Sequence, residues 1–122
     1  MESDRDCRMA RVVNRGDIWL VNLDPGFGRE IHKKRPALII SANAIHQNTA
    51  NAIIIPASSQ VPKTIGVEMV LVGKKEGLDK SSVLLPVFIR HIDQERLIKK
   101  IGSLPKVKMR EVEEAIKIVL DF

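Results

Sequence analysis

The chain has 122 residues, of which 44% are hydrophobic and 29% charged, a balance typical of one globular domain with one core. Its net charge of +5 and pI near 9.6 are compatible with nucleic acid or an acidic protein as a partner, because Lys and Arg displace counterions from phosphates, although many small basic proteins bind neither. With only 3% aromatic residues and no tyrosine, the chain lacks what a base-stacking sheet of the RRM type requires.

Residues 1–14 mix three acidic residues with three arginines, which predicts a flexible N-terminal extension before a folded domain at 15–122. The single cysteine, Cys7, lies in this segment, where it has no disulfide partner and no CxxC motif, and we expect it to be inert. The segment lacks the apolar centre of a secretory signal, and no apolar run of the chain is long enough to cross a bilayer. We therefore expect a cytoplasmic protein without membrane contact.

The first half of the chain alternates apolar runs with polar connections. Strands are predicted at 16–23, 36–42 and 51–57, and the continuous apolar run of the second favours burial on both faces. Between the first two strands, residues 24–34 form a charged loop with two glycines. Loops of about a dozen residues are uncommon in compact domains and are usually functional or disordered. Arg35 closes this loop, and Pro36 after it favours an extended backbone.

The second half of the chain ends in the clearest helical pattern. Residues 106–121 are predicted as a helix with one apolar face, formed by Met109, Val112, Ala115, Ile116 and Val119. Shorter elements precede it: one helical turn within 43–49, strands at 67–72, 82–92 and 98–104, and a turn at 93–96 capped by Asp93. The predicted fold class is α+β, a small antiparallel barrel-like sheet of five or six strands with a C-terminal helix.

Two polar side chains stand at the ends of predicted strands. Arg35 begins the second strand and Ser58 follows the third, so antiparallel pairing would bring both to one edge of the sheet. An arginine and a hydroxyl suit phosphodiester chemistry, which must neutralise charge on phosphate oxygens. Glu30 and His32, in the loop before Arg35, could each act as acid or base. RNA carries its own nucleophile, the 2′-OH, so this chemistry requires neither a metal nor a cofactor.

A plainer interpretation of the same residues is favoured on composition alone. In that interpretation Arg35 pairs with Glu30 or Asp17 on the surface, Ser58 and Ser59 cap a turn, and Lys33 and Lys34 are solvated. His91 would be a surface residue at a strand end. The three histidines, His32, His46 and His91, are widely spaced, and no metal-binding motif is present.

Several spaced motifs together resemble the MazF/PemK (Kid) family of toxins. The resemblance begins with Arg15-Gly16-Asp17-Ile18-Trp19 and continues with Leu23-Asp24-Pro25, Gly28-Arg29-Glu30, the run from Arg35 to Ser41, the run from Ile55 to Ser59, and Ile89-Arg90-His91-Ile92-Asp93. It covers residues 15–122 and leaves only the N-terminal extension outside. Each motif is weak alone, and the set is specific.

The resemblance implies an SH3-like barrel, a homodimer, and metal-independent, sequence-specific cleavage of single-stranded mRNA. It also implies a cognate antitoxin with an acidic C-terminal segment. The family's catalytic residues fall on Arg35, Ser58 and Glu30, with the 2′-OH attacking phosphorus, Arg35 stabilising the developing charge and Ser58 holding a phosphate oxygen. The residues expected to contact RNA are Lys33, Lys34, His32, Ser59, Gln60, Phe88, Arg90 and His91.

This chain also departs from the family pattern. Ile31 replaces a common Gln, Val87 and Phe88 replace an acid followed by Gln, and His91 replaces a Thr. Because some members use the acid at the Val87 position as the base, the base here stays open between Glu30 and His32. Two alternatives therefore remain: a toxin on the same barrel that poisons a protein such as DNA gyrase through its C-terminal helix, or a catalytically impaired RNA-binding member.

Overall fold

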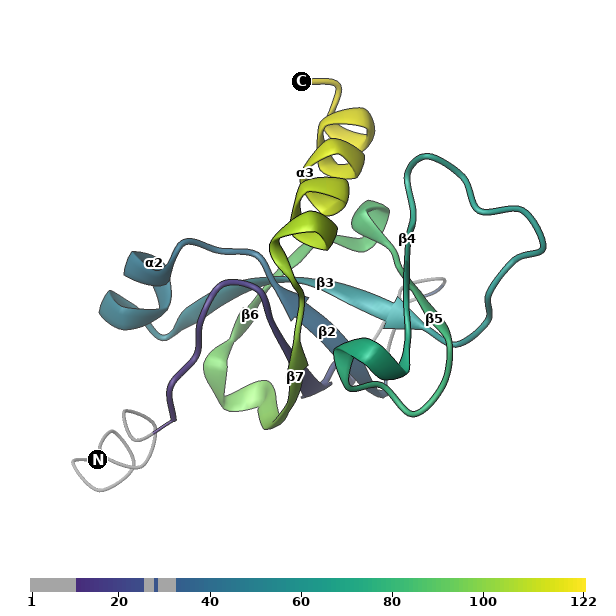
Figure 1. The fold of residues 1–122 in the computed structure, drawn as a ribbon. Coiled ribbons are helices and arrows are strands. Elements are labelled where there is room, and N and C mark those ends of the chain that lie inside the picture. The colour runs from purple at the N-terminus through teal and green to yellow at the C-terminus, as the bar shows by residue number, and fades with distance from the viewer. Residues whose placement is uncertain (1–10, 26–27, 29–32) are drawn as a thin grey trace.

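The computed structural model describes residues 11–25, 28 and 33–122, and Glu30, Ile31, His32 and Cys7 lie outside these ranges. Within them the chain forms a curled antiparallel sheet of seven strands, with a C-terminal helix that packs against it (Figure 1). No helix in the described ranges is both long and apolar enough to cross a membrane. The elements are β1 (Asp17–Asn22), β2 (Lys34–Ile39), α2 (Asn43–Asn48), β3 (Asn51–Ser58), β4 (Val70–Val72), η1 (Lys74–Glu76), β5 (Ser82–Leu84), η2 (Pro86–Phe88), β6 (Arg90–Asp93), η3 (Gln94–Arg96), β7 (Leu97–Ser103) and α3 (Lys106–Leu120).

The sheet is built around β3. Its strand order is β4-β5-β3-β2-β1-β7, and β6 also pairs with β3. Ile54 pairs with Ile39 of β2 and with Arg90 of β6, so β2 and β6 lie along opposite edges of β3. Further along, Ser58 pairs with Val83, so β5 takes over the edge that β6 leaves. The last residues of β3 therefore lie where the sheet changes partners.

Apolar side chains pack on both faces of the sheet, as strand alternation requires. On β2, Leu38 faces the cluster that includes Met109 and Val112 of α3, while Ala37 and Ile39 face a second cluster that includes Trp19. All three β2 residues are fully buried, which confirms the prediction that this strand is covered on both faces. The sheet thus holds Arg35, at the start of β2, on a rigid element.

The predicted strand at 82–92 is wrong as a single element. It is split into β5, η2 and β6, and the break lies beside Pro56. Leu85 N donates to Pro56 O at 3.0 Å, so the side of Pro56 that faces this segment has no N–H to offer in return. Pro86 lacks an N–H as well, and the ladder cannot continue where both donors are missing.

The other predicted elements are present with shifted bounds. The first, third and sixth predicted strands and the C-terminal helix agree with the structure to within one or two residues. The second strand lies at Lys34–Ile39 instead of 36–42, and the fourth is limited to Val70–Val72. The turn at 93–96 is η3, and Asp93 caps it by accepting a hydrogen bond from Glu95 N at 2.8 Å. The sheet has seven described strands, whereas five or six were predicted.

Residues 11–14, the described part of the predicted extension, pack on the domain. Val13 is buried in the cluster that contains Trp19. The guanidinium of Arg11 donates to the carbonyls of Leu97 and Gln94, at 3.2 Å for the latter, and lies 5.8 Å from the centre of the Trp19 ring. These contacts attach the chain before β1 to the start of β7.

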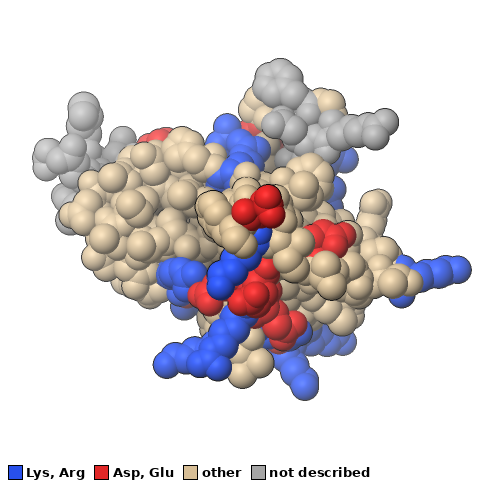
Figure 2. Space-filling view, turned by 90° about the horizontal axis from the view of Figure 1, so that it is seen from above, with Lys and Arg blue, Asp and Glu red and all other residues tan. Residues whose placement is uncertain are grey.

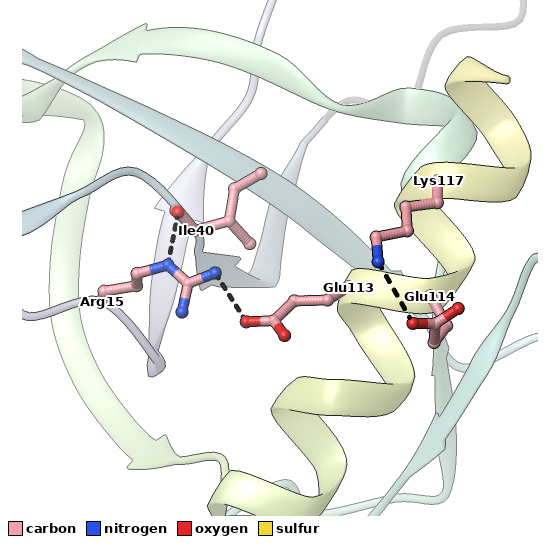
Figure 3. A network of polar contacts seen from close by, with 5 residues as sticks. All are labelled: Arg15, Ile40, Glu113, Glu114 and Lys117. Atoms are coloured by element: carbon pink, nitrogen blue, oxygen red, sulfur yellow. Dashed lines mark hydrogen bonds and ion pairs between the residues drawn. The ribbon is translucent and has the colours of Figure 1, made fainter. Parts of the chain in front are cut away.

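Arg15 links the end of β2 to α3. Its Nε donates to Ile40 O at 3.0 Å, and its Nη2 lies 3.1 Å from Glu113 Oε2 on the helix (Figure 3). One turn further along α3, Lys117 pairs with Glu114 at 3.4 Å. Figure 2 shows that acidic and basic side chains alternate around this helix, whereas the side of the same face that carries α2 shows few charges. The exposed side of α3 is thus covered by charges of both signs.

Candidate functional site: a cationic pocket at the end of the sheet

Arg35 is half-buried in β2 and pairs with Val21 of β1. The loop before it is closed at its base, where Leu23 N donates to Lys33 O at 2.8 Å and Lys33 N donates to Asp24 Oδ1 at 2.7 Å. Arg96 donates to the carbonyls of Asn22 and Asp24 and so fixes the start of the loop. The predicted loop therefore begins and ends at fixed points beside Arg35.

The antiparallel pairing predicted for the strands of Arg35 and Ser58 is confirmed. Ala37 pairs with Pro56 and Leu38 with Ile55, and the same register continued by two residues brings Arg35 opposite Ser58. Residues directly opposite in an antiparallel pair share a face of the sheet. The two side chains thus come from one end and one face of the sheet.

Ser58 also has a local hydrogen bond. Its Oγ accepts from Gln60 N at 3.2 Å, which is the turn-capping arrangement of the plainer interpretation. A hydroxyl that accepts one bond still has its own O–H to donate. The turn therefore orients Ser58 without using its donor.

A pocket of about 560 Å³ opens at this end of the sheet. Of the described residues that line it, five are cationic and one is acidic. The charged residues are Lys34, Arg35, Lys80, Lys99, Lys100 and Asp79. The remaining lining is apolar or hydroxyl-bearing, with Leu20, Pro36, Ala57, Leu78, Ile101, Gly77, Ser59 and Ser82. Such a surplus of positive charge attracts an anion, and an apolar floor suits a ligand with a flat uncharged part.

One wall of the pocket depends on two glycines. Gly77 has a φ of 99°, in the left-handed region, and a Cβ there would lie 2.6 Å from Ile101 O. A Cβ on Gly102 would lie 2.1 Å from Glu76 O. Backbones this close leave no room for a side chain, so η1 and Gly77 are seated directly on β7. We call this contact, formed by Glu76, Gly77, Ile101 and Gly102, the η1–β7 seam.

The structure gathers some of the predicted site residues and separates others. Lys34 and Ser59 line the pocket with Arg35, while Lys33 and Gln60 are exposed neighbours of lining residues. The second group lies along the edge of β3, away from the lining: Phe88 in η2, and Arg90 and His91 in β6. His91 is exposed and its Nε2 lies 2.7 Å from Asn51 Oδ1, as expected for a surface residue. Glu30 and His32 lie outside the described residues.

Sequence reasoning missed Asp79, Lys80, Lys99 and Lys100. The two lysines of β7 reach the pocket because β7 pairs with β1, where Leu20 lies opposite Lys99 and Trp19 opposite Lys100. Lys100 also lies 3.2 Å from Asp17 Oδ1, so Asp17 pairs with this lysine. The signal in the sequence was a pair of lysines in a predicted strand, which becomes informative only once the strand order is known.

Two further observations bound the site. Within the described ranges, no group of three or more His, Cys, Asp or Glu side chains is arranged to hold a metal ion. A second pocket of about 650 Å³ lies between residues 11–14 and the α2–β3 turn, and among the described residues that line it Arg11 is the one Lys, Arg, Asp or Glu. Of these two pockets, as the described residues line them, the one that contains Arg35 has the strong excess of positive charge.

Comparison with known proteins gives one consistent result. The sequence model of the family described as "PemK-like, MazF-like toxin of type II toxin-antitoxin system" matches residues 14–120. Endoribonuclease MazF9 of Mycobacterium tuberculosis is 32% identical over 116 residues, which cover 91% of this chain and 98% of the relative. Endoribonuclease EndoA of Bacillus subtilis is 33% identical over 110 residues, covering 89% and 95%. The crystal structure of MazF from Deinococcus radiodurans has a TM-score of 0.81 at 25% identity, covering 92% of this chain and 99% of that one. This likeness confirms the predicted fold class, a small antiparallel barrel-like sheet with a C-terminal helix, which the structure shows as a curled half-barrel.

Proposed function

This chain belongs to the PemK-like, MazF-like toxins of type II toxin–antitoxin systems, and we propose that it is an endoribonuclease that cleaves single-stranded mRNA at specific sequences. The observation that carries the proposal is the register of β2 and β3, which brings Arg35 opposite Ser58 at the end of the sheet where five cationic residues line a pocket. A polyanion that enters this pocket meets Arg35, and Ser58 lies opposite Arg35, between the lining residues Ala57 and Ser59.

The proposed reaction is an internal transesterification. The ribose 2′-OH attacks the adjacent phosphorus, a bond forms from O2′ to phosphorus, and the bond from phosphorus to O5′ breaks. The products are a 2′,3′-cyclic phosphate and a 5′-OH. Arg35 stabilises the negative charge that develops on the phosphate oxygens and donates a hydrogen bond to the leaving O5′, which takes its proton from water, and Ser58 donates to a phosphate oxygen. The protein in this scheme supplies position and charge, and the substrate supplies the nucleophile.

The proton of the 2′-OH needs an acceptor, which we assign to Glu30, with His32 as the alternative. Both belong to the loop that ends at Arg35 in the sequence, which is why they are the candidates. We propose that this loop covers the bound RNA, together with Lys33, Lys34, Ser59 and Gln60. Phe88, Arg90 and His91 would contact nucleotides further along the strand, since they lie along the β3 edge. Val87, which is 61% exposed, stands where some family members have an acid, so it cannot serve as the base.

The proposal includes partners and a compartment. An antitoxin with an acidic C-terminal segment would neutralise the toxin, because such a segment is attracted to the same cationic pocket that attracts RNA. We further propose that residues 15–122 form the toxin domain, that it works as a homodimer, and that it acts in the cytoplasm, where mRNA is translated.

The direct test incubates purified protein with a mixed RNA pool in EDTA and maps the new 5′ ends. We expect cleavage at a recurring sequence, 5′-OH termini, and a loss of at least about 100-fold in rate for Arg35→Ala, the magnitude typical of removing one donor to a developing oxyanion. The matched control is Arg110→Ala, an exposed arginine on α3 outside the pocket, which should cleave at the wild-type rate.

Two results would contradict the proposal. Cleavage that is unaffected by Arg35→Ala would remove this arginine from the reaction. Absence of cleavage under every buffer condition would refute the endoribonuclease assignment and favour either poisoning of a protein such as DNA gyrase or an impaired RNA-binding toxin. Sedimentation that gives a monomer at micromolar concentration would contradict the homodimer.

A further inference from the structure

The cationic pocket contains one negatively charged residue, which does not favour the binding of phosphate. Asp79 follows Leu78 in the β4–β5 connection and is the only acidic residue among the described residues that line the pocket. Five cations line the same pocket, and a carboxylate among them weakens their attraction for phosphate. Its presence therefore calls for a ligand group that a carboxylate binds.

Neighbouring contacts leave the Asp79 carboxylate available. Within the described ranges it has no hydrogen bond and no ion pair, although Lys80 is next to it in the chain. Lys100, another lining cation, is already paired with Asp17 at 3.2 Å. Ser82 is buried and donates its hydroxyl to Lys80 O at 3.1 Å, which fixes the end of this connection. Asp79 is exposed at a defined place on the rim, with acceptor capacity and no donor.

The floor below this rim suits a flat uncharged ring. Leu20, Pro36, Ala57, Leu78 and Ile101 contribute apolar surface, and the volume of about 560 Å³ lies in the range of small-molecule sites. Single-stranded RNA offers such rings, because its bases can turn out of the stack and be read on their Watson–Crick edges. The surrounding cations would then hold the phosphates on either side of the inserted base.

Hydrogen-bond complementarity selects among the four bases. A carboxylate has two acceptor oxygens and binds best to two donors side by side, as in its pairing with arginine. Guanine presents this pattern, with N1–H and the N2 amino group adjacent on one edge. Adenine and cytosine place a ring acceptor beside their amino group, and uracil flanks its single N–H with two carbonyls. Only guanine can donate two adjacent hydrogen bonds to a carboxylate without placing an acceptor atom against one of its oxygens.

We infer that the pocket bounded by Asp79 and the apolar floor binds a guanine base of the RNA, and that Asp79 is the residue that specifies it. The inference rests on the proposed endoribonuclease function and adds its substrate preference. Because Arg35 lines the same pocket, the guanine lies close to the cleaved bond. The cleavage sequence therefore includes guanine at one fixed position.

The test compares guanine with inosine, which lacks only the N2 amino group. Cleavage sites of the wild-type protein are mapped first, and an oligonucleotide carrying the preferred site is then made with inosine at each guanine in turn. We expect one substitution to lower the cleavage rate about 10- to 100-fold, the discrimination typical of a bidentate contact to a base. In Asp79→Asn the guanine and inosine substrates should be cleaved within about threefold of each other. Glu111→Gln, which alters an exposed carboxylate on α3, should keep the wild-type discrimination.

A binding measurement separates this inference from the function on which it rests. Fluorescence anisotropy with 2′-deoxy oligonucleotides, which lack the nucleophile, should show tighter binding of the guanine than of the inosine form, and Asp79→Asn should abolish the difference. Guanine-dependent binding without any RNA cleavage would refute the proposed function and support the guanine pocket. Cleavage sites without a fixed guanine, or a discrimination that Asp79→Asn leaves unchanged, would refute the guanine pocket and support the function. Equal thermal unfolding midpoints of the wild-type protein and of Asp79→Asn would establish that this exposed substitution leaves the fold intact.

Discussion

Replacing Gly102 by alanine tests whether the η1–β7 seam holds the pocket together. The added Cβ would lie 2.1 Å from Glu76 O and 2.9 Å from Glu76 C, whereas ordinary contacts to a Cβ are 3.4 Å or longer. The backbone of Glu76 cannot move freely, because Glu76 N donates to Gly73 O at 3.0 Å and Gly73 N donates to Glu76 Oε1 at 2.6 Å. Relief of the clash requires η1 and β7 to separate by more than an ångström.

The expected cost is at the upper end of the range for overpacking. Extra methyl groups in a packed interior typically lower the free energy of unfolding by about 1–3 kcal/mol, and here the obstacle is backbone that is fixed by its own hydrogen bonds. We therefore expect Gly102→Ala to lower the free energy of unfolding by about 3 kcal/mol. For a chain of this size, that loss lowers the thermal midpoint by roughly 10 °C.

Urea unfolding followed by tryptophan fluorescence measures this loss, because Trp19 is the only tryptophan and is buried. Gly73→Ala is the matched control: its Cβ would lie 3.8 Å from the nearest atom, so its unfolding midpoint should shift by much less. Gly102→Ala should also weaken RNA cleavage at temperatures where it remains folded, since the pocket wall moves. An unfolding midpoint of Gly102→Ala equal to that of wild type would refute the seam as a tight contact.

Two further predictions concern contacts away from the pocket. Gln94 Nε2 donates to the carbonyls of His46, Thr49 and Asn51 at 2.9, 2.9 and 3.2 Å. Gln94→Ala should therefore lower the free energy of unfolding by about 1–3 kcal/mol in the same urea assay. A loss no larger than that caused by the control substitution of an exposed residue, Gln47→Ala, would contradict this prediction. The Arg15–Glu113 ion pair at 3.1 Å is 38% and 44% exposed, and a double-mutant cycle with alanine should give a coupling below about 1 kcal/mol, whereas a value of several kcal/mol would show that the pair anchors α3.

Much of the fold could be predicted because its signals are local. Apolar runs define β1, β2 and β3, and the apolar stripe of α3 has helical spacing. The break between β5 and β6 was not predicted, since its cause is shared by two segments. Pro56 of β3 and Pro86 of η2 interrupt the ladder because Pro86 directly follows Leu85, which bonds to Pro56, and this is known only after the segments have been paired.

The same distinction applies to the site. Arg35 and Ser58 could be placed together because β2 and β3 follow one another in the chain, and consecutive strands usually pair. Lys99 and Asp79 could not be assigned to the pocket from the sequence. Lys99 reaches the pocket because the first strand pairs with the last, and Asp79 reaches it because the η1–β7 seam holds the preceding residues on β7. These are long-range contacts made by backbone, and residue types give little indication of them.

The η1–β7 seam also limits how this protein can diverge. The stretch that begins at Gly77 closes the curled sheet onto β7 and, two residues later, supplies Asp79 and Lys80 to the pocket. Insertions or deletions at the seam would open the barrel, whereas Asp79 and Lys80 are exposed and can be exchanged without cost to the core. Lineages that acquire a new RNA target should therefore differ by point substitutions at these two positions while the length of the connection stays constant. Directed evolution of the cleavage specificity should likewise vary Asp79 and Lys80.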